Sequence, residues 1–229
     1  MTSESYREEL DRAVAFTGTS HEFFAGAKAT ELLRLADAHL GDPATLDTLD
    51  AGCGIGLTDR HLAGRFRSLT GTDLSPEALE TASRENPDVR YELAESGRLP
   101  FDAGAFHLTF AANVVQVVPT DERATFVAEL ARVTRPGGLV SLFEHNPYNP
   151  LTRLVVRRFS LSSDVRMLAL GATLRLLRQA SLTPIVSGYM LLWPSRRRRL
   201  VAVERALRRI PLGAQYYVVA RRRYELDSQ

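Results

Sequence analysis

The stretch LDAGCGIG, residues 49–56, decides the fold of this chain. It follows residues 45–50, which alternate apolar and polar side chains as a short strand does, and it precedes residues 57–66, which we expect to form a helix. A strand, a glycine-rich loop and a helix in this order hold a nucleotide-containing ligand at the carboxyl end of a parallel sheet. Glycines allow the backbone to approach such a ligand because they carry no Cβ. The stretch therefore predicts a ligand site in a parallel α/β sheet.

The spacing of the glycines narrows the kind of ligand. A dinucleotide loop, G-x-G-x-x-G, would place its third glycine where Leu57 stands, and the G-K-[S/T] of a phosphate-binding loop is absent. Asp50 beside the loop would repel a pyrophosphate and favour a cation. Asp73, which we expect at the end of a strand 19 residues after Gly54, suits two ribose hydroxyls. S-adenosylmethionine (SAM) has a ribose, a sulfonium and an ammonium but no phosphate. A glycine turn without a ligand is the alternative.

Strands and helices alternate outward from this loop. The alternation predicts a doubly wound parallel α/β sheet, and a late strand pair could add an antiparallel edge. Ser75 and Pro76 carry the signature of a helix start, with Ser75 as the N-cap. We expect helices at 3–16, 21–40, 57–66, from 76 onward, from Thr120 or Asp121 to Val133, at 150–159, at 164–180 and at 196–209. We expect strands at 45–50, 68–73, 89–93, 105–111, 139–143 (after a turn at 135–138), 184–192 and 214–220.

Composition fits an ordinary globular protein. The 229 residues fit one α/β domain, and 45% hydrophobic and 24% charged residues argue against disorder. The single cysteine excludes an internal disulfide and leaves no cluster for structural zinc, and no other residue pattern predicts a metal site. The start MTSESYREEL is too polar for a signal peptide, and no apolar run is long enough to span a membrane. We therefore expect a cytoplasmic protein.

The net charge of +2 conceals a split between the two halves of the chain. Residues 1–114 carry a net charge of −9, whereas residues 115–229 carry +11. Such asymmetry is a hint of an anionic partner. All but one of the basic residues are arginines, and the exception is Lys28.

The ordered motifs resemble those of one known family. LDAGCGIG, then Asp73, then ESGRLPF at 95–101 and RPGGLV at 135–140 resemble the class I SAM-dependent methyltransferases, in their small-molecule branch. The resemblance covers about residues 45–145. It implies SAM as cofactor and a Rossmann-like seven-stranded sheet whose last strand is antiparallel. It also implies one domain, in which residues 1–43 form a helical lid, 44–145 bind SAM, and 146–229 supply acceptor-side segments and the final strands.

The resemblance also implies roles for individual residues in SAM binding. Lys28 is either a ligand of the SAM carboxylate or a solvated surface lysine, and Cys53 is a small packed residue rather than a nucleophile. The residues implied around the methionine part are Asp50, Gly52, Cys53, Gly54 and the backbone carbonyl of Asn113, with Asp73 on the ribose, Leu74 on the adenine ring, and Glu95 and Ser96 facing the adenine amino group.

Three side chains are candidates for work on the acceptor. His145 lies after the fifth expected strand, where a general base could meet the acceptor, although it could equally pair loop carbonyls. Tyr148 is a second candidate, or else a wall of the pocket. His21 lies beside two phenylalanines on the expected lid and is otherwise a residue of the helix start.

The basic helix expected at 196–209 leaves the partner open. It combines an apolar stripe with flanking arginines, which suits a solvated face, a cap over an anionic acceptor, a membrane surface or a nucleic acid. Aromatic residues for base stacking are scarce there, which disfavours nucleic acid. The sequence predicts methyl transfer to a small organic acceptor, in natural-product biosynthesis, on oxygen, nitrogen or carbon. The alternatives are an RNA or tRNA methyltransferase and a SAM-binding protein that does not methylate, such as a cyclase. Nothing in the sequence indicates an oligomeric state.

Overall fold

A central sheet of seven strands organises the molecule. The computed structural model describes residues 12, 20–159, 165–192 and 206–224. The strand order is β3-β2-β1-β4-β5-β7-β6. The first five strands are mutually parallel, whereas β7 runs antiparallel to both β5 and β6. The strands are β1 (Asp47–Ala51), β2 (Ser68–Asp73), β3 (Arg90–Leu93), β4 (Phe106–Ala112), β5 (Thr134–His145), β6 (Leu182–Met190) and β7 (Gln215–Arg222).

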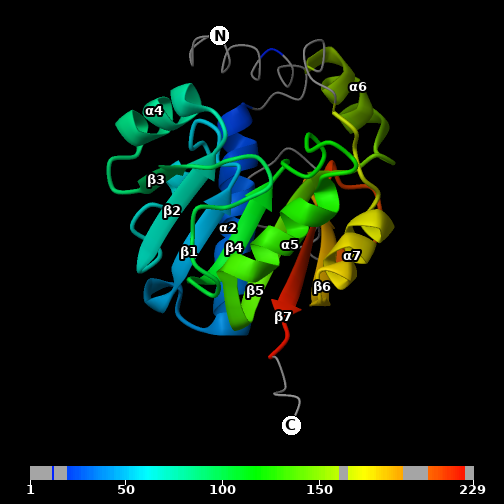
Figure 1. The fold of residues 1–229 in the computed structure, drawn as a ribbon. Helices are drawn as coiled ribbons and strands as arrows, with labels where there is room; N and C mark the ends of the chain where they lie inside the picture. The colour runs from blue at the N-terminus through cyan, green and yellow to red at the C-terminus, as the bar shows by residue number, and fades with distance from the viewer. Residues whose placement is uncertain (1–11, 13–19, 160–164, 193–205, 225–229) are drawn as a thin grey trace.

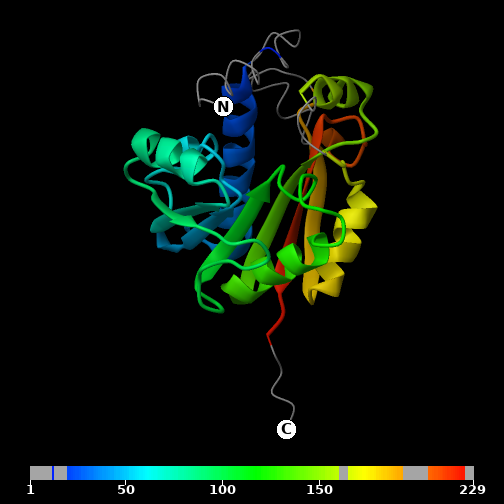
Figure 2. The same ribbon diagram turned by 45° about the horizontal axis from the view of Figure 1, so that its top comes forward.

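Helices cover both faces of this sheet. Figure 1 shows α5 (Arg123–Val133) and α7 (Leu170–Gln179) in front of the sheet and α2 (His21–Leu40) behind it. The view in Figure 2 shows α6 (Pro150–Phe159) beyond the end of the sheet where β5 finishes. The remaining helices are η2 (Pro43–Thr45), α3 (Asp59–Leu62) and α4 (Pro76–Glu85). The described part of the chain is thus a three-layer α/β unit, open at the carboxyl ends of its parallel strands.

Two hydrophobic clusters hold the layers together, one on each face of the sheet. Val127 and Leu130 of α5 belong to one cluster, and Leu32 and Leu35 of α2 belong to the other. The central strands contribute to both clusters, so they are buried on both sides. This explains the nearly continuous burial of β5 from Gly138 to Glu144.

The sequence predicts several elements to the residue. Helix 21–40 and strand 68–73 are confirmed with their expected bounds. Ser75 caps α4 as expected, because its hydroxyl accepts a hydrogen bond of 3.2 Å from the amide of Ala78. The parallel doubly wound sheet and the antiparallel last strand are confirmed as well.

Other expected bounds are wrong. Only Asp59–Leu62 of the expected helix 57–66 is helical, because the glycine loop continues as turns up to Thr58. Residues 135–138 do not precede β5 but form an irregularity inside it: Thr134 pairs with Phe106, whereas Leu139 pairs with Leu108. Gly137 allows this because its φ is 78°.

Further along the chain, some elements begin later than expected, and others lie outside the described residues. The residue before α5 is Glu122 rather than Thr120 or Asp121, and α7 begins at Leu170 rather than at 164. The expected helix 3–16 and most of the basic helix 196–209 lie outside the described residues. None of the helices in the described part of the chain combines the length and the apolarity that a membrane-spanning helix needs.

Candidate cofactor and acceptor site

A large cavity opens at the carboxyl ends of the parallel strands. Its volume is about 1210 Å³. The glycine loop and the ends of β2, β4 and β5 line it, together with residues of α2, α5 and α6 and the start of β7. Pockets for one small molecule usually measure about 300–1,000 Å³. The cavity therefore has room for two small ligands side by side.

The glycine loop is fastened to the neighbouring strand β2. The amides of Gly52 and Cys53 both donate to the carbonyl of Thr72, at 2.7 and 3.0 Å. This turn requires a positive φ of 81° at Gly52, which residues other than glycine rarely adopt. The loop is therefore fixed at the edge of the cavity before any ligand arrives.

The three glycines of the loop differ in what surrounds them. A Cβ on Gly52 would lie 2.6 Å from a methyl group of Val114, and one on Gly56 would lie 2.5 Å from the amide nitrogen of Asn86. A Cβ on Gly54 would meet no atom within 4 Å, although Gly54 also has a positive φ, of 56°. Gly52 and Gly56 are thus required by protein packing, whereas the space over Gly54 belongs to the cavity.

Asp73 links the loop to the end of β2. One carboxylate oxygen accepts the amide hydrogen of Gly54 at 2.8 Å, and the other accepts that of Ser75 at 3.0 Å. Each carboxylate oxygen can accept a second bond, so hydroxyl groups of a ligand can still bind. Asp73, for which the sequence predicts a ribose contact, and the 60%-exposed Leu74, for which the family resemblance implies an adenine contact, both line the cavity.

Four charged side chains lie buried beneath the loop. Burial lowers the pKa of Lys28 to about 8, against the charges of Asp50 and Glu144, which raise it. Burial also raises the pKa of Glu144 to about 8. The pKa of Asp50 is raised well above its usual range, first by burial and then by the carboxylate of Asp59, whose own pKa burial raises to about 6. Lys28 is therefore not a solvated surface lysine.

Sequence reasoning missed two of these four residues, Asp59 and Glu144. Asp59 accepts a hydrogen bond of 2.9 Å from the hydroxyl of Tyr91 and supports the loop from below. Glu144 accepts the amide hydrogen of Val115 at 2.9 Å. A carboxylate within the apolar run of β5 was the signal that could have drawn attention to Glu144.

Two buried acceptors near the loop have no hydrogen-bond partner among the described residues. They are Oδ1 of Asp50 and Oδ1 of Asn113. Both residues line the cavity. Unpaired buried acceptors are costly, so they suit a ligand that brings donors or positive charge. These two acceptors, together with the open space over Gly54, fit the amino-acid part of SAM, whose ammonium group donates.

The remaining cofactor candidates also border the cavity. Glu95 and Ser96 line it in a short turn closed by a bridge between Glu95 and Arg98. Cys53 lines it too, and burial raises the pKa of its thiol. A thiol with a raised pKa stays protonated at neutral pH, which favours the packed residue over the nucleophile.

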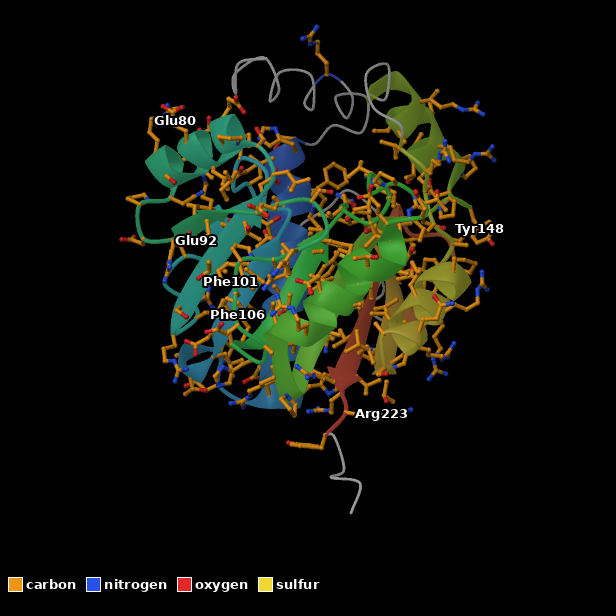
Figure 3. All side chains as sticks on the ribbon, viewed as in Figure 1. Glu80, Glu92, Phe101, Phe106, Tyr148 and Arg223 are labelled. Carbon is orange, nitrogen blue, oxygen red and sulfur yellow. The ribbon has the colours of Figure 1, made fainter. Side chains whose placement is uncertain are left out.

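Of the three acceptor-side candidates, two line the cavity and one does not. His145 lines the cavity, and its Nδ1 lies 2.8 Å from the amide nitrogen and 3.0 Å from the amide oxygen of Gln116. Burial, with the nearby charge of Lys28, lowers the pKa of His145 to about 3, so it is a weak base. His21 also lines the cavity. Tyr148 does not: it is 65% exposed and lies at the periphery of the molecule in Figure 3, so the expectation of a pocket wall is wrong.

Comparisons with known proteins agree with this geometry. The family described as "Methyltransferase domain" matches residues 48–138. The chain is 32% identical to the malonyl-[acyl-carrier protein] O-methyltransferase of Pectobacterium atrosepticum over 145 residues, which cover 62% of this chain and 55% of that protein. It is 32% identical to the 2-methyl-6-phytyl-1,4-hydroquinone methyltransferase of Synechocystis over 108 residues, covering 45% of this chain and 33% of that protein. The chain thus spans about a third to a half of the length of these relatives.

A solved structure extends the likeness over nearly the whole chain. The SAM-dependent methyltransferase of Thermotoga maritima, described as a possible histamine N-methyltransferase, superposes with a TM-score of 0.67. The match covers 96% of this chain and 98% of that one at 15% identity, so it shows a common fold. Residues 48–138 thus match a methyltransferase domain, and the described fold is that of the class I SAM-dependent methyltransferases.

Proposed function

We propose that this protein transfers the methyl group of SAM to a small organic acceptor. The observation that carries the proposal is the open space over Gly54, bordered by Asp73 and by the orphaned acceptors of Asp50 and Asn113. The match of residues 48–138 to a methyltransferase domain supports the same activity. A small acceptor fits because the cavity has room for a second molecule beside the cofactor. A cytoplasmic location stays a prediction.

The residues around the glycine loop and the neighbouring strand ends would hold the cofactor. Asp73 would accept the ribose hydroxyls, with Leu74, Glu95 and Ser96 around the adenine ring. Asp50 and the carbonyl of Asn113 would receive the ammonium, and Lys28 would face the carboxylate. Bound SAM would supply a methyl group on a positively charged sulfur: a lone pair of the acceptor would form the new bond to the methyl carbon as the carbon–sulfur bond breaks, which leaves neutral S-adenosylhomocysteine, and an acceptor hydroxyl would release its proton to water.

The protein's contribution to the reaction would be alignment and exclusion of water. Methyl transfer is an in-line displacement, so the acceptor atom must lie opposite the leaving sulfur. Apolar residues of α6, including Val155 and Val156, line the cavity on the side that we assign to the acceptor. His145 would orient the acceptor by a hydrogen bond rather than remove its proton, because a group with a pKa of about 3 binds protons weakly.

The test is incubation of the protein with methyl-labelled SAM and a panel of small acceptors. We expect label in at least one acceptor, together with saturable binding of S-adenosylhomocysteine (SAH). Binding of SAH with no label transferred to any acceptor would favour a role without methylation. Absence of SAH binding would contradict the cofactor site itself.

A further inference from the structure

The charges that line the cavity are confined to one part of it. Lys28, Asp50 and Asp73 surround the glycine loop. The other charged lining residues lie in the turn at 95–98, directly before α5 and on α5; they are Glu95, Arg98, Glu122 and Glu129. From residue 145 onward, no described lining residue is an aspartate, glutamate, lysine or arginine. These lining residues are His145, Asn149, Leu151, Thr152, Val155, Val156, Val165, Leu191, Leu192, Ala214 and Gln215. We call the part of the cavity lined by this set the acceptor half.

Three neutral polar side chains gather at the base of the acceptor half. His145 at the end of β5 pairs in register with Gln215 at the start of β7, so they are neighbours across the two strands. Gln116, which follows β4, engages Nδ1 of His145. Gln116 and Gln215 are each 3% exposed, and all three residues line the cavity. The position of this group is therefore fixed by three different parts of the chain.

Two atoms of this group are available to a ligand. Among the described residues, His145 bonds through Nδ1 alone, which leaves Nε2 as the ring nitrogen that can meet a ligand. Oε1 of Gln215 is buried and has no partner among the described residues. His145 is held neutral by burial and by the charge of Lys28, so the group presents hydrogen bonds without net charge.

On the basis of the proposed function, we propose that the acceptor is an uncharged, largely apolar molecule whose one polar group, such as a phenol hydroxyl, binds between His145 and Gln215. Among the described residues of the acceptor half, an ionised acceptor would lose its hydration to valines and leucines, and none of these lining residues carries an opposite charge. Lys28, whose charge acts on His145, lies outside this half and is itself buried. A purely apolar molecule would leave the buried polar atoms unpaired, and a site built to hydrogen-bond a hydroxyl rejects the analogue that lacks it.

The experiment compares three probes of similar size on the full chain saturated with SAH. The probes are 4-butylphenol, butylbenzene and 4-butylbenzoate, and binding is measured by titration calorimetry at neutral pH. We expect the phenol to bind at least about fivefold more tightly than butylbenzene and at least about tenfold more tightly than the benzoate. Benzoate binding as tight as phenol binding, or no binding of any probe, would overturn the proposal.

Variants assign the preference to the named residues. In Gln215→Leu and in His145→Leu, we expect the advantage of the phenol over butylbenzene to fall below about twofold, with SAH affinity unchanged. Thr125→Val, a change at an exposed cavity residue on α5, should keep the advantage. Retention of the full advantage in both leucine variants would overturn the assignment. The titrations are repeated without SAH, so a failure of SAH binding would count against the proposed function while the probes still decide the acceptor class.

Discussion

Lys28 and Glu144 are the least expected residues of the site, because two groups that normally carry charge lie buried beside each other. Lys28 is 8% exposed and Glu144 is fully buried. Burial favours the neutral form of each, which is why both have a pKa of about 8. Such arrangements are rare outside functional sites, and here they lie directly under the proposed methionine subsite.

The raised pKa of Glu144 gives stability a specific dependence on pH. The folded state holds the proton of Glu144 more tightly than the unfolded state does. The contribution of this proton to the free energy of unfolding is therefore fully present below the ordinary pKa of about 4.5 and is lost as the pH rises through about 8. Glu144→Gln stays neutral throughout. We therefore expect its free energy of unfolding, relative to the wild type, to improve by roughly 4 kcal/mol between about pH 5 and about pH 9. Urea unfolding of both proteins at the two pH values measures this change. If the stability difference between the variant and the wild type is the same at both pH values, the raised pKa of Glu144 is refuted.

Asp73 gives a direct test of the ribose contact. Asp73→Ala loses two acceptors of charge-assisted bonds, each contributing roughly 1.5–3 kcal/mol, so SAH should bind at least about tenfold more weakly. Asp73→Asn is the matched control for the loop, because its carbonyl oxygen can still accept the amide hydrogen of Gly54. It should fold like the wild type, as judged by Tm, and still bind SAH more weakly. Wild-type affinity in both variants would exclude Asp73 from the site.

Single residues were predictable from the sequence where a local motif carries them. Asp50, Gly54 and Asp73 follow from a strand, a loop and the next strand, which are close in the chain. Gln116 and Gln215 were missed because both are far from His145 in the sequence. The pairing of β5 with β7 brings Gln215 to His145, and Gln116 comes from the segment that follows β4. Tyr148 was misplaced because spacing in the sequence does not show which side of a loop a side chain takes.

At the scale of elements, the start of α4 positions the end of β2 and hence Asp73. Ser75→Ala removes the hydroxyl that accepts from Ala78, and we expect a loss of about 1 kcal/mol in the free energy of unfolding. Ser75→Thr keeps the oxygen and should recover most of that stability. Denaturant unfolding of the three proteins measures this. Equal stability of the alanine variant and the wild type would show that the cap contributes nothing.

Most elements could be predicted because their signals are local. Apolar spacing locates α2, and Ser75-Pro76 locates α4. The length of α3 could not be predicted, since the loop before it is set by contacts of Gly56 with Asn86 from another part of the chain. The irregularity at 135–138 is likewise decided by pairing with β4.

At the scale of the whole molecule, the split of charge between the halves acquires a structural meaning. The acidic half contributes Asp50 and Asp73 to the cofactor subsite, which suits a ligand with a sulfonium. The described lining residues from the basic half include Glu122 and Glu129 but no lysine or arginine. The described residues of the basic half therefore give the acceptor half of the cavity no cation that would bind an anion.

This arrangement predicts that RNA is not the acceptor. We expect no labelled methyl in RNA after incubation with labelled SAM, and no filter retention of RNA at about 150 mM salt, because weak electrostatic binding falls steeply with salt. Small acceptors from the panel serve as the positive control. Methylated RNA would contradict the small-molecule assignment.

The order of the strands could not be derived from periodicity, because it depends on which distant strands pair. The alternation predicts a parallel doubly wound sheet, whereas the antiparallel last strand was implied by the family resemblance. The pairing of β7 between β5 and β6 brings Gln215 beside His145 and completes the acceptor half.

The central claim is that the space over Gly54 receives SAM, and one pair of variants tests it most directly. Gly54 and Gly64 both have a positive φ, of 56° and 69°, and a Cβ on either would meet no protein atom within 4 Å, but of the two only Gly54 lines the cavity. Alanine should therefore strain the backbone at both sites, at a cost of roughly 1 kcal/mol. Titration calorimetry with SAH should show wild-type affinity for Gly64→Ala and at least about a tenfold loss for Gly54→Ala, because the new methyl group occupies ligand space. Equal SAH affinity of the two variants, or no SAH binding by the wild type, would contradict the account.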